Sequence, residues 1–96
     1  MSGEWIQWPL MEEEILIIEN KKNVVFNIPY SLYKNGLENH LKDLHINKIY
    51  TRQDPLGGPR IILILDKQNA LELKAWITLQ LSKSSHKYFV TDLEEI

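Results

Sequence analysis

The stretch Lys48–Lys67 reads KIYTRQDPLGGPRIILILDK and contains the longest apolar run of the chain, Ile61–Leu65. Strand-forming residues lie on both sides of the turn sequence Asp-Pro-Leu-Gly-Gly-Pro, which predicts a β-hairpin with strands near Ile46–Arg52 and Arg60–Asp66. A run without polar alternation is typical of a strand that is covered on both faces. We therefore expect the second strand of this hairpin to be central in its sheet.

A helix is expected directly after this strand, from Asn69 to Ser82, with Asp66 or Asn69 as its N-cap. At 100° per residue its apolar side chains fall on two nearly opposite sides, with Trp76 between them. One side is expected to face the core. The other side needs a cover, which either the N-terminal arm with Trp5 and Trp8 or a second subunit or protein partner could supply. The first consists of Ala70, Leu73, Ile77 and Leu81, and the second of Leu71, Ala75 and Leu79.

Four further elements are expected around this hairpin and helix. Strands are predicted near residues 14–19, 24–28 and 87–91, and a helix over Ser31–Leu44 that is weakened at Gly36. From residue 24 onward the order β-α-β-β-α-β is that of the ferredoxin-like two-layer sandwich, with two helices on one face of a mainly antiparallel sheet. We predict this α+β fold with an extra strand from an N-terminal β-hairpin. A duplicated ββα unit, residues 14–44 and 46–82, is the alternative.

Length and composition favour one ordinary globular domain over residues 1–96, with 44% hydrophobic and 25% charged residues. The longest apolar run is too short to cross a membrane, and the N-terminus lacks the pattern of a secretory signal. The chain has no cysteine, so thiol chemistry is excluded and a cytoplasmic location is the simpler expectation.

Charge is distributed unevenly along the chain. The first 20 residues carry five glutamates and no basic residue, and the tail 92–96 adds three acidic residues. The apolar and acidic N-terminal arm, residues 1–12, holds Trp5 and Trp8, which are expected to pack either on their own domain or on a partner. The acidic ends either neutralise the basic middle, which is the simpler interpretation, or leave it open to an acidic partner.

No motif for catalysis, metal binding or cofactor binding stands out. His40 and His45 are five residues apart and miss the spacing that places two ligands on one helix face. The Gly-Gly of the hairpin turn is followed by a strand, and a phosphate-binding loop would open a helix instead. We therefore expect a protein that is not an enzyme and binds no metal or cofactor.

Two kinds of contact surface are predicted. The preferred one is a protein-binding surface for another protein or a second copy, which would suit an inhibitor, an immunity, antitoxin or phage-type regulator, or an assembly subunit. Its expected residues are Trp5, Trp8, Leu71, Ala75, Trp76 and Leu79. The alternative is an anion or nucleic-acid site at the base of the hairpin loop, where Arg52 and Arg60 face each other near Lys48. The net charge of −2 makes nucleic acid the weaker choice.

Overall fold

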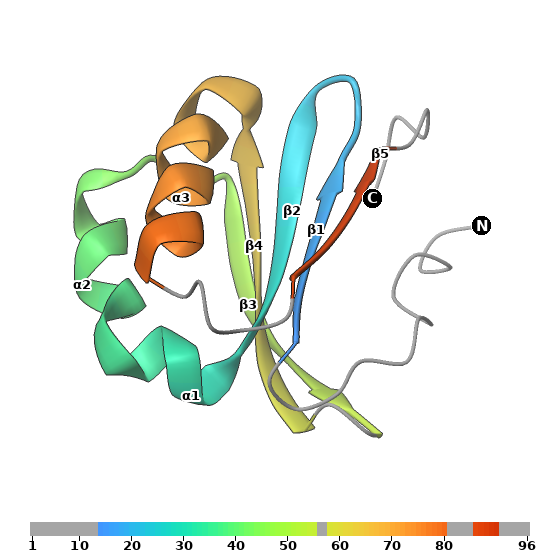
Figure 1. Cartoon of the computed structure of the whole chain (residues 1–96), viewed down its shortest axis with the longest axis vertical. Coiled ribbons are helices and arrows are strands. Elements are labelled where there is room, and N and C mark those ends of the chain that lie inside the picture. Colours follow the sequence, from blue (N-terminus) through green and yellow to red (C-terminus); the bar gives the residue numbers. More distant parts are fainter. Residues whose placement is uncertain (1–13, 56–57, 81–85, 91–96) are drawn as a thin grey trace.

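The computed structural model describes residues 14–55, 58–80 and 86–90. Five strands form one sheet in the order β3-β4-β2-β1-β5, and the helical segments lie together on one of its faces (Figure 1). The strands are β1 (Ile15–Glu19), β2 (Asn23–Pro29), β3 (Lys48–Asp54), β4 (Gly58–Asp66) and β5 (His86–Val90). The predicted α+β sandwich with helices on one face is confirmed.

Strand β4 is central, as its sequence predicts. It pairs antiparallel with β2 on one side and with β3 on the other. Leu63 points to the helical face and is fully buried there, while Ile62 points to the opposite face and is equally buried. Coverage of both faces favours apolar side chains at successive positions, which explains the unbroken run Ile61–Leu65.

The strand order differs from the ferredoxin-like order at one place. The antiparallel part of the sheet, β3-β4-β2-β1, consists of two hairpins joined through β2 and β4. Strand β5 then pairs with β1, in parallel, so β1 separates it from β2. The extra N-terminal strand therefore lies inside the sheet. The two joined hairpins, each followed by a helical segment, also correspond to the alternative division into two ββα units.

The first helical segment is irregular. It comprises α1 (Tyr30–Leu32), a π-helical turn (Tyr33–Leu37), α2 (Glu38–His40) and a final 3-10 turn (Leu41–Asp43). Gly36 interrupts the helical path with a φ of 133°, a conformation that costs a residue with a side chain considerably more than glycine. Leu37 and Leu41, which follow the break, are buried against the sheet.

Helix α3 (Lys67–Gln80) begins directly after β4. The carboxylate of Asp66 accepts hydrogen bonds from the backbone and side-chain nitrogens of Asn69, each at 2.9 Å, so Asp66 is the cap among the two candidates in the sequence. Ala70, Leu73 and Ile77 are buried against the sheet. The expected fourth member of this face, Leu81, lies outside the described residues.

Candidate interaction surface

The outer side of α3 carries an apolar stripe that the described residues leave exposed. We define this outer stripe as Leu71, Ala75 and Leu79, which follow one another at intervals of four residues. The two leucines are 66% and 75% exposed, and Ala75 between them is also exposed. Burial of a leucine side chain is worth about 1.5–3 kcal/mol, so such a stripe favours association with another apolar surface.

Trp76 does not belong to this exposed stripe. Its indole is half-buried and stacks on the imidazole of His40, with ring centroids 5.0 Å apart and the planes inclined by 17°. This contact joins α3 to α2 inside the chain, so Trp76 has a structural role that the sequence periodicity did not indicate. The other two tryptophans predicted to contact a partner, Trp5 and Trp8, lie outside the described residues.

Exposed side chains of the edge strand β5 continue the surface beside α3. Tyr88 is 46% exposed and Val90 is 70% exposed. The ammonium group of Lys74 lies 4.6 Å from the centre of the Tyr88 ring and therefore connects the helix to the strand. Two shallow hollows, of about 460 and 370 Å³, share Leu71 and Lys74 in their linings. The outer stripe and the β5 edge thus form one continuous region.

The charges of this region are largely neutralised within the chain. The carboxylate of Glu19 accepts a hydrogen bond from the Tyr88 hydroxyl at 2.7 Å and lies 3.6 Å from the ammonium group of Lys74 and 3.7 Å from that of Lys67. The Tyr88 hydrogen bond is the largest influence that lowers the pKa of Glu19, and the same bond raises the pKa of Tyr88. The region therefore has little excess charge to attract a polyanion.

We expect Tyr88→Phe to destabilise the protein by at most about 1 kcal/mol at pH 7, because a solvent-screened hydrogen bond is lost. Since the pKa of Glu19 is lowered by folding, its contribution is present above the ordinary carboxyl pKa and is lost as the pH falls through the folded-state value. The free energies of unfolding of the wild type and Tyr88→Phe, measured with urea, should therefore become equal at acidic pH. Tyr50→Phe on β3 is the control, and its effect should not depend on pH over this range.

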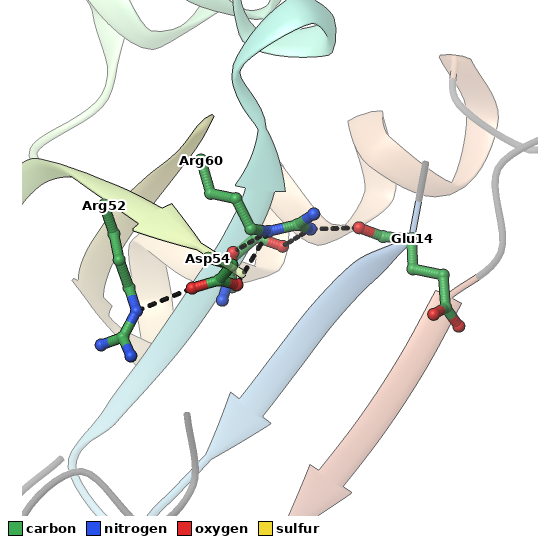
Figure 2. Close-up of polar contacts among 5 residues, drawn as sticks. Glu14, Arg52, Asp54 and Arg60 are labelled. Carbon is green, nitrogen blue, oxygen red and sulfur yellow. Dashed lines mark hydrogen bonds and ion pairs between the residues drawn. The ribbon is translucent and has the colours of Figure 1, made fainter. Parts of the chain in front are cut away.

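The hairpin base contains a second cluster of polar groups, shown in Figure 2, on the sheet face away from the helices. Arg52 and Arg60 are opposite each other in the β3–β4 register, as the sequence predicted. Between them lies Asp54, whose carboxylate accepts a hydrogen bond from Nε of Arg52 at 2.8 Å and lies 3.9 Å from Nε of Arg60. The two arginines thus share a carboxylate that belongs to the chain itself.

Arg60 is fully buried, whereas the sequence suggested that its guanidinium could hold an anion at the base of the loop. It donates hydrogen bonds to the side chain and the backbone carbonyl of Asn27 and to the backbone carbonyl of Glu14 (Figure 2). These contacts connect β4 to β2 and to the residue that precedes β1. Burial lowers the pKa of Arg60, and the neighbouring carboxylates of Asp54 and Glu14 oppose this shift. Arg60 is therefore a structural residue.

Lys48 and Arg52 are the two predicted anion-binding residues that remain accessible. Lys48 is exposed, with its ammonium group 5.2 Å from the centre of the Tyr50 ring, and the side chain of Arg52 is one-third exposed. With Arg60 buried and Arg52 paired to Asp54, the cluster offers a weaker site for phosphate than the sequence suggested.

Two further features bear on the chemistry of the described part of the chain. Residues 14–55, 58–80 and 86–90 contain no group of three histidine, aspartate or glutamate side chains close enough to hold a metal ion. No helix in these ranges is long and apolar enough to span a membrane.

Some residues of the hairpin-base cluster and of the surface around α3 and β5 could have been found from the sequence. Asp54, Arg60 and Asn27 occupy the pleat positions that share a face with Ile62, so a correct register would have placed them together. Tyr88 and Val90 are two residues apart on β5 and therefore share one face of the sheet, which the sequence could show. Their exposure depends on how far α3 extends over that face, which the sequence could not show. Comparison with known proteins gives no further identification, because no family model, no curated protein and no solved structure matches the chain.

Proposed function

We propose that this chain is a small, non-enzymatic, cytoplasmic protein-binding module that acts by occupying the surface of another protein. The exposed outer stripe of α3 supports the proposal, since Leu71 and Leu79 remain 66% and 75% exposed although the helix already buries its opposite face. An inhibitor, a regulator of the immunity, antitoxin or phage type, or an assembly subunit would use such a surface. For the architecture, we propose a ferredoxin-like sandwich into which β1 has been inserted.

The composition of the region agrees with an interface. Aromatic and apolar side chains are enriched at the centre of protein–protein contacts, and charged residues concentrate at the rim. Here Tyr88 and the outer stripe are flanked by Lys67 and Lys74, which are both close to Glu19. The nucleic-acid alternative is supported by Lys48 and Arg52 alone, because Arg60 is buried.

An affinity capture from the native host with the purified 96-residue chain tests the proposal. We expect the double variant Leu71→Glu with Leu79→Glu to lose a protein that the wild type retains, because the two carboxylates would be desolvated at an apolar contact. Ile49→Glu is the matched control, since Ile49 is 46% exposed on the opposite edge strand. Equal capture by the double variant and the wild type would contradict the proposal, as would salt-sensitive retention of nucleic acid.

A further inference from the structure

We infer that the partner of the outer stripe is a second copy of this chain, with α3 of one copy packed antiparallel on α3 of the other. This inference rests on the proposed function, since it names the occupant of the same surface. The reason is the symmetry of the stripe. Leu71 and Leu79 lie four residues before and four residues after Ala75. A two-fold axis through Ala75 therefore brings Leu71 of one copy to Leu79 of the other.

The small central residue suits a symmetric contact. Residues four apart form a ridge along a helix, and ridges of two helices pack at interaxial distances of 8–10 Å. An alanine at the crossing point allows the backbones to approach closely, while the two exposed leucines on each copy pack on either side of it. Because the contact is isologous, both copies bury the same residues and the association closes as a dimer.

The charges near the proposed axis permit this arrangement. Lys74 is the basic residue closest along the helix to Ala75, and its ammonium group lies beside Glu19 and over the Tyr88 ring. Each copy therefore brings to the axis a lysine that already has a carboxylate beside it, although Glu19 is shared with Lys67. The helix of 14 residues is about 21 Å long, so the contact is small. Interfaces of this size are typical of weak association, and we expect a Kd in the micromolar range.

Sedimentation equilibrium of the 96-residue chain over a wide concentration range tests the dimer. We expect a monomer–dimer equilibrium in which Leu79→Glu raises the Kd at least about 100-fold, because each substitution changes two positions of a symmetric interface. The Ile49→Glu control should associate like the wild type. A strict monomer at millimolar concentration overturns the inference.

The absence of native cysteine allows a test of the register. In the proposed dimer Ala75→Cys places two thiols beside the axis, where a disulfide needs Cα atoms about 4.4–6.8 Å apart. Leu71→Cys alone places them about 12 Å apart along the helices, too far for a disulfide. Rapid cross-linking of Ala75→Cys, with slow cross-linking of Leu71→Cys and of an Ile49→Cys control, is the expected result.

Equal cross-linking of Ala75→Cys and Leu71→Cys would overturn the inferred arrangement even if a dimer forms. The outcomes also separate this inference from the proposed function. If the protein is monomeric but the double glutamate variant loses a captured protein, another protein occupies the stripe and only the inference fails. If the protein is monomeric and the double variant captures the same proteins as the wild type, both fail.

Discussion

Replacing Arg60 by methionine is expected to destabilise the protein by about 3–5 kcal/mol, because it removes one partner of a buried charge pair. The guanidinium of Arg60 is fully buried and donates to Asn27 and to the carbonyl of Glu14. Methionine fills a similar volume without these donors, and Asp54 would keep only Arg52 as its arginine partner. A domain of this size has about 5–15 kcal/mol of stability in total, so the variant should be close to unfolding.

Urea unfolding followed by circular dichroism measures this effect. Arg52→Met is the matched control, and we expect it to cost no more than about 1 kcal/mol because the side chain of Arg52 is one-third exposed. Arg60→Lys should fall between the two, since a single ammonium group cannot reproduce the planar set of donors. Similar losses for Arg60→Met and Arg52→Met would show that Arg60 does not have the structural role assigned to it.

The second large effect is expected in β4, where Ile62→Ala and Leu63→Ala should each destabilise the protein by about 2–5 kcal/mol. The two side chains point to opposite faces of the sheet, and both are fully buried. Similar losses are therefore expected although the helices lie on the side of Leu63 alone.

Ile49→Ala on β3 is the control for this pair. Its side chain is 46% exposed, so its removal should cost clearly less than either β4 substitution. Thermal and urea unfolding of the three variants give the comparison. A small loss for Ile62→Ala beside a large loss for Leu63→Ala would mean that the face away from the helices is open to solvent in solution.

The elements and the central position of β4 could be predicted because they depend on local patterns. The apolar run Ile61–Leu65 indicates burial on both faces, and Asp66 is one of two residues whose position suggests a helix cap. The break at Gly36 was visible as a weak point, although its left-handed geometry was not. These signals reside in a few neighbouring residues and do not depend on the pairing of distant strands.

The strand order could not be predicted in the same way. The position of β1 between β2 and β5 depends on parallel pairing between residues about 70 positions apart, for which the sequence carries no local signal. The burial of Arg60 was missed for a related reason. Its partners, Asn27 and the carbonyl of Glu14, come from two other segments and become neighbours only when the register is known.

The candidate interaction surface was predicted in part. The helical periodicity correctly separated the outer stripe from the core side of α3, because the positions follow from the helix geometry alone. It did not reveal that Trp76 stacks on His40, since that contact requires the relative placement of α2 and α3. Nor did it reveal Tyr88 and Val90, which extend the same surface through the sheet edge.

Hydroxyl-radical footprinting, which modifies exposed leucine, isoleucine and aromatic side chains, tests most directly whether the outer stripe is a contact surface. The chain is labelled once as dilute purified protein and once in native host extract at its natural concentration. We predict that modification of Leu71 and Leu79 falls several-fold in the extract, while modification of Ile49 does not change. Equal modification of the two leucines under both conditions, or protection of Ile49 instead, would contradict the account.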